Sequence, residues 1–326
     1  MRKMLITGAT GFIGVELVQQ LSACGYVPRV LVRRPHRAAL LSAAEVIPYQ
    51  GDLLAPRSLA RAVDGVDTVF HLGGRASFES YDRLRPTIVD ATDTLGRLAA
   101  DAGVRHFVFA SSLFVHGETD GPIDAETPTR PRLGYGRAKL EAEDRLLSIA
   151  RTSEMTVACV RLPHVYGSQS ILFEQTRSGV AIFPGAMSNR CGQLHVDDAA
   201  RLLAAVGDQR WSGRSAVADQ TTVTWSDFFD VLRSLDPSLR LIRPPRWLGI
   251  AGGSVLETIF SRSGRPTLYT KDTVVGFNLD LPVAPQLIWP ELDLAPRYPS
   301  IYEGIPAVLD GYVRYRWRHP IADRRS

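Results

Sequence analysis

The segment TGATGFIG at residues 7–14 constrains the fold of this chain more than any other feature. It follows the short apolar run MLI and precedes a stretch with helical periodicity over 12–24, so its glycines lie at a strand-to-helix turn. Gly8, Gly11 and Gly14 let the backbone approach a pyrophosphate at the helix N-terminus, where free N–H groups attract negative charge. The segment therefore predicts dinucleotide binding. The predicted contacts in this turn are Gly8, Thr10, Gly11, Phe12, Ile13 and Gly14.

Strand-like runs alternate with longer amphipathic stretches through the first half of the chain. Such alternation predicts an α/β fold, here a Rossmann-type doubly wound parallel sheet with helices on both faces. The strand-like runs are MLITG, VPRVLVR, EVIPYQGDL, VDTVFHL, HFVFASS and VACVRLP, and the helical stretches are 12–24, 56–63, 88–102 and 135–151.

The pattern weakens after RLPHVYG, where Gly, Pro and aromatic residues become frequent, and it returns in HVDDAARLLAAV and in a short strand-like run, SAVAD. We therefore predict an NADP-binding Rossmann domain over 1–166, with 192–219 returning to it. Residues 167–191 and 220–326 would form a smaller substrate lobe that is discontinuous in sequence.

One apolar stretch of that lobe, WLGIAGGSVLETIF at 247–260, has three interpretations. We expect a buried helix of the small lobe. A lid over an apolar substrate and a helix lying on a membrane stay open as alternatives, although the adjacent Gly252 and Gly253 count against a regular amphipathic surface helix.

Composition limits the class of protein further. The 326 residues are 45% hydrophobic and 22% charged, and no apolar run is long enough to cross a bilayer. The net charge of +4 comes from arginines scattered along the chain, so we expect no nucleic-acid partner. The densest arginine cluster lies at 314–326, where we expect a solvated terminus, with peripheral membrane contact as the alternative. Three cysteines without a C-x-x-C pair predict neither a metal site nor disulfides, and a cytoplasmic location fits best.

The end of the second strand predicts which dinucleotide is bound. A carboxylate gripping the ribose 2′-hydroxyl of NAD is expected near Val32, but the chain has Arg33 and Arg34. Guanidinium groups would pair with the 2′-phosphate of NADP, so NADP(H) is favoured over NAD(H), with plain surface arginines as the alternative. The other predicted cofactor contacts at strand ends are Asp52, which could instead cap the next helix, Leu53, Leu72, Gly73 and Gly74.

Tyr135 and Lys139 are four residues apart on a predicted helix, so their side chains share one face. Lys139 is one of only three lysines in a chain that otherwise uses arginine. A cation about 4 Å from a phenol contributes roughly 4 kcal/mol at an effective dielectric constant of about 20, which would lower the pKa of Tyr135 from its ordinary value of about 10 before burial opposes it. The slender ammonium also fits beneath the tyrosine better than a rigid guanidinium. Both residues are predicted to be catalytic and to contact the cofactor.

Ser112 ends the fifth strand, where its hydroxyl could hold a substrate oxygen as charge develops there. Ser111 beside it is the rival, and we predict it as a further cofactor contact.

At these residues the chain resembles the extended short-chain dehydrogenase/reductase family of the NAD-dependent epimerase/dehydratase superfamily. The resemblance rests on TGATGFIG, GDL, HLGG, FASSLFVHG, YGRAK, RLPHVYG and HVDDAA in family order. It implies a catalytic triad of Ser112, Tyr135 and Lys139, and a nicotinamide carboxamide held by backbone near Pro163, His164 and Val165. It also implies a homodimer that pairs through helices 88–102 and 135–151.

Within that family, RLPHVYG and the apolar C-terminal lobe look like the 3β-hydroxysteroid dehydrogenases. Dehydratases carry an acidic pair after the catalytic hydroxyl, where this chain has the apolar Leu113 and Phe114. Ile88 and Ala91 stand where the family carries an asparagine of the proton relay. We predict an NADP(H)-dependent oxidoreductase that interconverts a ketone and a secondary alcohol on an apolar, steroid-like or polycyclic small molecule. A nucleotide-sugar epimerase with retained NAD and a non-catalytic dinucleotide sensor are the alternatives.

Overall fold

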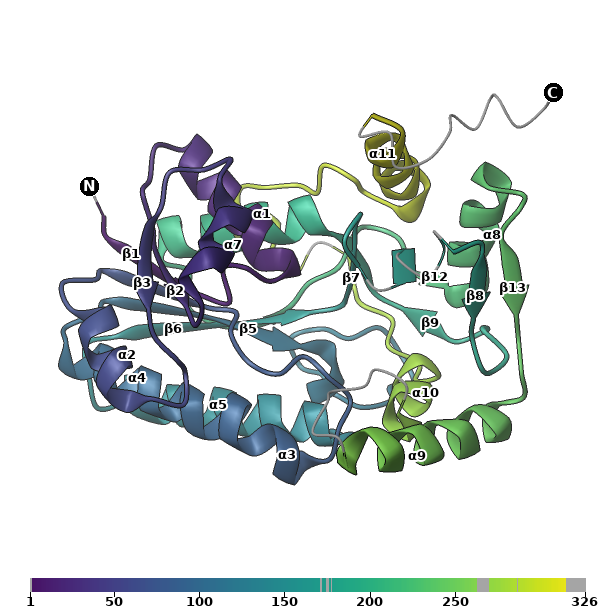
Figure 1. Ribbon diagram of the computed structural model, residues 1–326, viewed down its shortest axis with the longest axis horizontal. Helices are drawn as coiled ribbons and strands as arrows, with labels where there is room; N and C mark the ends of the chain where they lie inside the picture. Colours follow the sequence, from purple (N-terminus) through teal and green to yellow (C-terminus); the bar gives the residue numbers. More distant parts are fainter. Residues whose placement is uncertain are drawn as a thin grey trace.

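A seven-stranded parallel sheet forms the centre of the larger part of the molecule (Figure 1). The computed structural model describes residues 2–170, 172–173, 176, 178–262, 270–285 and 287–314. The strand order is β11-β6-β5-β4-β1-β2-β3. The chain adds β2 and β3 on one side of β1 and then adds the later strands on the other side, beginning with β4, as in a doubly wound sheet. The strands are β1 (Met4–Thr7), β2 (Arg29–Val32), β3 (Ile47–Gln50), β4 (Thr68–His71), β5 (His106–Ser112), β6 (Thr156–Leu162) and β11 (Gly213–Ala216).

Helices cover both faces of this sheet, which confirms the predicted fold class. One face packs against α1 (Phe12–Ala23) and α7 (Val196–Gln209) in one continuous apolar core. A second core lies on the other face, under α2 (Pro56–Val63), α4 (Ala91–Asp101) and α5 (Gly134–Ala150). The shorter elements of this half are η1 (Pro35–Leu41), α3 (Tyr81–Arg85), η2 (Pro86–Asp90) and η3 (Leu113–Val115).

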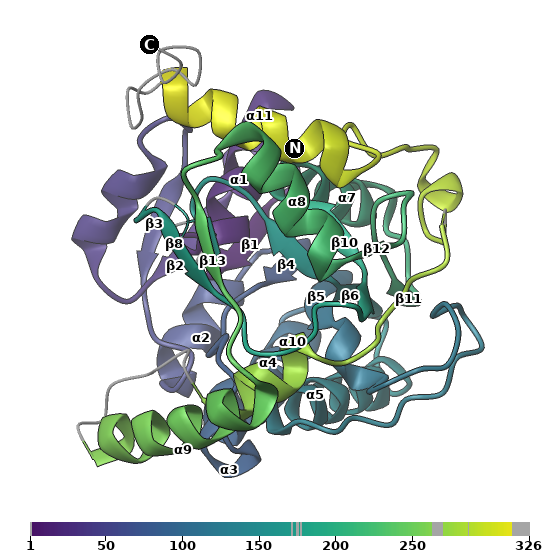
Figure 2. The same ribbon diagram turned by 90° about the vertical axis from the view of Figure 1, so that its right-hand side faces the viewer.

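The second lobe is built from short strand pairs and helices (Figure 2). They surround an aromatic core that includes Phe173, Phe183, Trp225, Phe228 and Phe229. Its strand pairs are β7 (His164–Tyr166) with β10 (Gln193–His195), β9 (Arg190–Cys191) with β12 (Val223–Thr224), and β8 (Val180–Ile182) with β13 (Arg240–Ile242). Its helices are α8 (Trp225–Leu235), α9 (Arg246–Arg262), α10 (Lys271–Phe277) and α11 (Ile301–Arg314). Between the last two, η4 (Pro290–Leu292) returns to the large sheet, where Leu292 joins the core under α7.

The predicted elements of the first half agree with the structure within a few residues. The helix expected over 88–102 differs in one respect, because its first residues belong to a π-helical turn, η2, that precedes α4. This turn begins at Pro86, which has no N–H to donate. The strand-like run near 215 is β11, at the edge of the large sheet. The predicted domain boundaries, the homodimer and the cytoplasmic location stay predictions.

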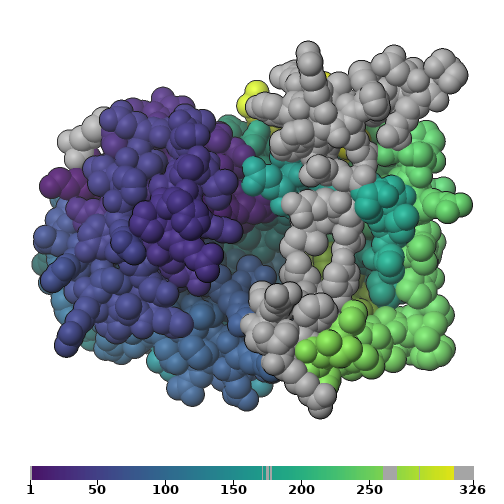
Figure 3. Space-filling model, viewed as in Figure 1, coloured from purple at the N-terminus to yellow at the C-terminus, as the bar shows by residue number. Residues whose placement is uncertain are grey.

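The prediction that the helix over 247–260 is buried is wrong. α9 lies on the surface, along the lower edge of the second lobe in Figure 3, with Trp247 67%, Val255 59% and Ile259 57% exposed. Periodicity predicted the helix correctly but not which side faces the protein. No helix in the described ranges is both long and apolar enough to cross a bilayer. The arginine cluster predicted to be a solvated terminus lies, from residue 315 on, outside the described residues.

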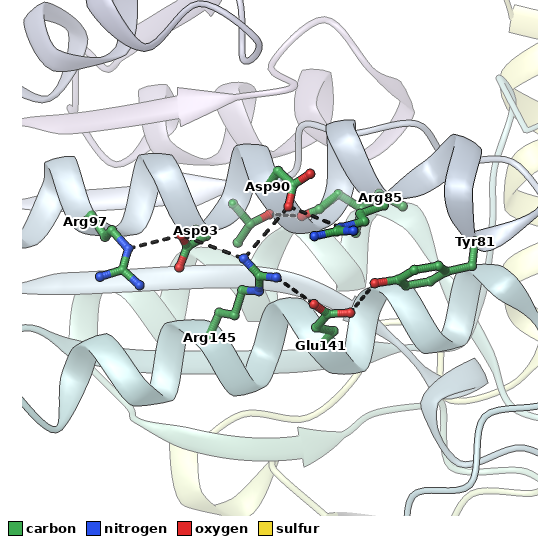
Figure 4. Close-up of polar contacts among 9 residues, drawn as sticks. Tyr81, Arg85, Asp90, Asp93, Arg97, Glu141 and Arg145 are labelled. Carbon is green, nitrogen blue, oxygen red and sulfur yellow. Dashed lines mark hydrogen bonds and ion pairs between the residues drawn. The ribbon is translucent and has the colours of Figure 1, made fainter.

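The outward side of the helix layer over α3, η2, α4 and α5 carries a network of ion pairs (Figure 4). Arg145 of α5 is central, since it contacts Glu141 at 2.7 Å, Asp90 at 3.8 Å and Asp93 at 3.9 Å. Glu141 in turn accepts a hydrogen bond from the Tyr81 hydroxyl. These partly buried charges connect α5 to its neighbours on the side away from the sheet.

Candidate active site

Glycines bring the first strand-to-helix turn against the end of β4. Gly8 has φ +73°, and a Cβ there would lie 2.7 Å from the Gly73 nitrogen. A Cβ at Gly14 would lie 2.1 Å from the Gly8 oxygen, so neither position accepts a side chain without moving backbone. α1 begins after Gly11 without a side-chain cap or an acidic residue in its first turn. Its free N–H groups and this narrow cradle fit a pyrophosphate.

A chain of hydrogen bonds fixes the HLGG loop from below. The Gly73 N–H donates to Thr7 Oγ1 at 3.2 Å, and the Thr7 hydroxyl lies 2.6 Å from His71 Nδ1. His71 Nε2 lies 2.9 Å from Thr92 Oγ1, whose own hydroxyl donates to the Ile88 carbonyl. Because the Thr92 hydroxyl already donates its single proton to the Ile88 carbonyl, it accepts the hydrogen bond from His71, so His71 carries its proton on Nε2. Burial lowers the pKa of His71 to about 3 and keeps it neutral.

The remaining predicted cofactor positions of this half lie at the carboxyl edge of the sheet. Arg33 and Arg34 follow β2 directly and are both exposed. Asp52 Oδ1 accepts a hydrogen bond from the Leu54 N–H at 3.0 Å, so the carboxylate caps its own turn, whereas the N-cap residue of α2 is Ala55. Leu53 reaches the glycine loop, because a Cβ at Gly73 would lie 2.7 Å from Leu53 Cδ1.

Close backbone packing brings the start of α5 to the end of β5. A Cβ at Gly136 would lie 2.1 Å from the Phe114 oxygen, so only glycine lets the helix approach the η3 turn that follows Ser112. The Tyr135 ring then lies with its centre 6.4 Å from that of Phe114 and 5.8 Å from that of Phe78. Tyr135 thus lies beside Lys139 on α5, and Ser112 lies two residues before Phe114, whose ring faces Tyr135.

Lys139 is buried with its ammonium group in a defined position. Nζ donates a hydrogen bond to the Ala110 carbonyl at 2.6 Å, and it lies 4.6 Å from the Phe109 ring centre and 5.7 Å from the Tyr135 ring centre. Burial lowers the pKa of Lys139 to about 8, an effect that the nearby Glu143 carboxylate opposes. At neutral pH the side chain is therefore still mostly charged.

The expected effect of Lys139 on the pKa of Tyr135 is wrong for the protein on its own. Burial raises the pKa of Tyr135 to about 12. The phenol lies against apolar rings, and the ammonium directs its hydrogen bond to a main-chain oxygen, so desolvation of the phenolate outweighs the attraction. The free protein therefore holds Tyr135 protonated.

The two serines at the end of β5 face opposite ways, as successive strand residues do. Ser112 Oγ lies on the side of η3, where it accepts a long hydrogen bond of 3.4 Å from the Phe114 N–H. Ser111 points to the other face and donates its hydroxyl to Glu143. Ser111 is thus hydrogen-bonded to α5, the helix that carries Tyr135, whereas the Ser112 hydroxyl lies at the η3 turn beside Phe114.

Glu143 is a buried residue near the site that sequence reasoning missed. It contacts Arg161 Nη2 at 2.8 Å and Arg214 Nε at 3.0 Å, and it accepts the Ser111 hydrogen bond. Arg161 Nη1 lies 3.1 Å from His116 Nε2, and burial lowers the pKa of His116 to about 4. The available signal was spacing, since Glu143 follows Lys139 by four residues on the same helix face.

The predicted carboxamide segment Pro163–Val165 leads into β7 of the second lobe. His164 Nδ1 lies 2.6 Å from Gln193 Oε1 of β10, and burial lowers the pKa of His164 to about 4. The imidazole is packed edge-on against Trp225 and Phe228, with ring centres 4.8 and 5.8 Å away. The His164 side chain is therefore fixed by packing against residues of the second lobe.

Aromatic residues from both lobes line the region beside Tyr135. Phe78 contacts Phe114 edge-on at 5.0 Å and Phe277 of α10 at 6.4 Å between ring centres. Gly276 lies against the same group, since a Cβ there would be 3.3 Å from the Phe114 ring. Leu113 belongs to an adjoining apolar cluster with Leu133. Sequence reasoning found Leu113 and Phe114 but missed Phe78 and Phe277, which come from distant segments.

The fold and its glycine turn define a Rossmann-type α/β protein. The chain belongs to the NAD dependent epimerase/dehydratase family, whose model matches residues 4–216. The described residues contain no cluster of His, Cys, Asp or Glu that could hold a metal ion.

Among individual relatives, a ceramide reductase of Caulobacter vibrioides is 26% identical over 94% of this chain and 91% of that protein. A 2-alkyl-3-oxoalkanoate reductase of Stenotrophomonas maltophilia is 31% identical over 61% of this chain and 63% of that protein. The solved structure of MoeE5 with UDP-glucose and NAD has a TM-score of 0.77 at 23% identity, over 97% of this chain and 100% of that one. This structural likeness establishes the fold.

Proposed function

We propose that the protein is an NADP(H)-dependent oxidoreductase that interconverts a ketone and a secondary alcohol on an apolar substrate. The observation that carries the proposal is the Tyr135 phenol, protonated and enclosed by aromatic rings one helical turn from the Lys139 ammonium. Apolar walls leave the hydroxyls of a sugar without partners but suit alkyl or ring carbons. Two relatives are named for the reduction of ceramide and of a 2-alkyl-3-oxoalkanoate, which supports this substrate class.

The residues of the chain have distinct roles in the proposed reduction. A bound nicotinamide supplies the hydride. Tyr135, protonated at neutral pH because burial raises its pKa to about 12, donates its proton to the substrate oxygen, and the Ser112 hydroxyl donates a hydrogen bond to the same oxygen. The Lys139 ammonium then stabilises the Tyr135 phenolate that remains, so that burying this anion costs less free energy than burying it without a nearby cation. The glycine turn from Gly8 to Gly14 would hold the pyrophosphate.

The preference for NADP(H) rests on Arg33 and Arg34, which are exposed at the end of β2 where a 2′-phosphate would lie. Calorimetric titration with NADPH and NADH tests it. We expect tighter binding of NADPH, and we expect the pair Arg33→Ser and Arg34→Ser to weaken NADPH binding by about tenfold or more while NADH binding is unchanged. Equal affinity for both nucleotides in the unsubstituted protein would refute the preference.

The proposed reaction is tested by NADPH consumption with a series of ketones of increasing alkyl length, beside a matched assay with UDP-glucose and UDP-galactose. We expect kcat/KM to rise with chain length, because each buried methylene contributes up to about 0.8 kcal/mol. NAD released on denaturation together with interconversion of the two nucleotide sugars would replace the proposal with epimerase activity. Binding of NADPH without turnover of any substrate would favour a dinucleotide sensor.

A further inference from the structure

The outward face of α9 is apolar along its described length. Trp247, Leu248, Val255, Leu256 and Ile259 are all exposed, and Ala251 and Gly252 lie between them on the same side. At helical spacing these positions form one continuous face over 247–259, in which Thr258 is the polar side chain that the structure describes. A helix at the surface of a globular protein ordinarily turns charged or polar residues outward, so this helix is inverted.

The inner side of α9 explains why the helix keeps this orientation. A Cβ at Gly253 would lie 2.7 Å from the Lys271 nitrogen, and one at Gly249 would lie 2.4 Å from Pro184 Cβ. The glycines therefore let α9 lie directly on the start of α10 and on the β8 segment. Any rotation that buried Val255 or Ile259 would drive bulkier residues into that backbone. The apolar face stays outward as a result of packing.

Positive charge lies at the N-terminal end of this face. Arg240, Arg243 and Arg246 are exposed, whereas Glu257, the acidic residue within 240–262, is half-buried on the inner side. The neighbouring strand ends add the cross-strand pair Ile182 and Ile242, which are 54% and 50% exposed. Arginines beside an apolar face that carries a tryptophan are typical of helices that lie at the boundary between lipid headgroups and acyl chains.

We propose that α9 docks the protein on the surface of an anionic lipid bilayer. The helix lies in the interface plane with Trp247, Val255 and Ile259 among the acyl chains, and the arginines contact the headgroup phosphates. The docked helix is connected to the candidate active site through α10, since Val274 lies behind Gly249 and Phe277 contacts Phe78 beside Tyr135. The docking itself does not depend on the proposed reaction.

Flotation of the full chain with vesicles tests the apolar part of the proposal. We compare vesicles of pure phosphatidylcholine with vesicles of phosphatidylcholine and phosphatidylglycerol in equal parts. We expect the chain to float with the anionic vesicles, and we expect the pair Val255→Gln and Ile259→Gln to reduce partitioning by at least about tenfold. The matched control is Leu40→Gln, at a residue 55% exposed on η1, which should float like the unsubstituted chain. Equal loss in the control, or no loss in the α9 variant, would overturn the proposal.

A second variant tests the charged part. Arg243→Gln with Arg246→Gln leaves the apolar face intact, and it should weaken partitioning to anionic vesicles by about tenfold or more while weak binding to neutral vesicles is unchanged. Circular dichroism confirms that each variant is folded. The competing occupant of the face is a second copy of the chain. Absence of flotation combined with a dimer by light scattering that Val255→Gln and Ile259→Gln convert to a monomer would overturn lipid docking in favour of self-association.

Discussion

α5 and α9 are both 17 residues long and are built in opposite senses. α5 turns the charged Lys139 and Glu143 toward the sheet and presents ion-paired charges outward. α9 turns Gly253 toward the protein and presents Val255 and Ile259 outward. α9 is the reverse of an ordinary amphipathic helix, whereas α5 departs from one by burying two charges among its apolar residues.

The difference between the two helices lies in how the free-energy cost of each unusual arrangement is compensated. Burying a charge is costly unless it is paired and hydrogen-bonded, and α5 meets this condition within the fold through the Ala110 carbonyl, Arg161 and Arg214. The exposed apolar face of α9 has no such compensation among the residues that the structure describes, so it marks an interaction surface. The charges that α5 buries are thus compensated inside the fold, and the apolar residues that α9 exposes are those proposed above to dock on lipid.

The largest effect should come from removing the α5 phenol. Tyr135→Phe keeps the ring contacts with Phe78 and Phe114 but deletes the proton donor, so we expect turnover to fall by about a thousandfold with NADPH affinity unchanged. Trp247→Ala on α9 is the counterpart, and it should leave turnover of a water-soluble ketone unchanged. Steady-state kinetics and calorimetry measure both. Comparable turnover in the two variants would show that the Tyr135 phenol has no larger role in the reaction than an exposed side chain of α9.

The next effect concerns the buried carboxylate. Glu143→Gln leaves Arg161 without its counter-charge in the interior, and we expect it to lower the free energy of unfolding by about 3 kcal/mol. Glu141→Gln, on the outer side of the same helix, removes one partly exposed ion pair and should cost at most about 1 kcal/mol. Urea unfolding of the two variants compares them directly. Similar losses in the two variants would mean that the inward and outward charges of α5 contribute equally to the free energy of unfolding.

A smaller effect should appear in the pH dependence of stability. The pKa of folded Lys139 is lowered by burial to about 8 from an ordinary 10.5, so between these values the unfolded chain binds more protons than the folded one. Stability from this group therefore rises with pH across that window. Relative to Lys139→Met, the unsubstituted protein should gain about 2 kcal/mol between about pH 7.5 and about pH 9.5. Parallel pH profiles would show that Lys139 is not desolvated.

The smallest effect is expected on α9. The pair Val255→Gln and Ile259→Gln should change the free energy of unfolding by no more than about 0.5 kcal/mol, because both side chains already face solvent. A loss of several kcal/mol would show that these residues are packed, and the contrast with α5 would disappear.

Much of the fold was predictable because local patterns determine it. The glycines at 8, 11 and 14 follow an apolar run and precede a helical one, and strand-like runs recur between amphipathic stretches. The spacing of Tyr135 and Lys139 likewise places them on one face wherever the helix packs. These features need no knowledge of tertiary structure.

What the sequence did not reveal depends on packing across distant segments. Phe277 reaches the site from α10, and the direction in which Ser111 points depends on Glu143. The pKa of Tyr135 was misjudged because charge can be read from spacing but burial cannot. Apolar content of α9 was visible, yet its orientation is set by the approach of Gly253 to Lys271.

The position of β11 at the edge of the large sheet has a consequence for synthesis of the protein. β11 and α7 arrive after the chain has left the sheet at β6 and passed through part of the second lobe, and α7 supplies Leu202, Leu203 and Val206 to the core beneath α1. A nascent chain that has emerged from the ribosome only as far as residue 166 therefore exposes that core and lacks an edge strand. The dinucleotide-binding half can therefore be completed during synthesis only once residue 216 has emerged, and until then the emerging chain exposes apolar surface of the kind that promotes aggregation.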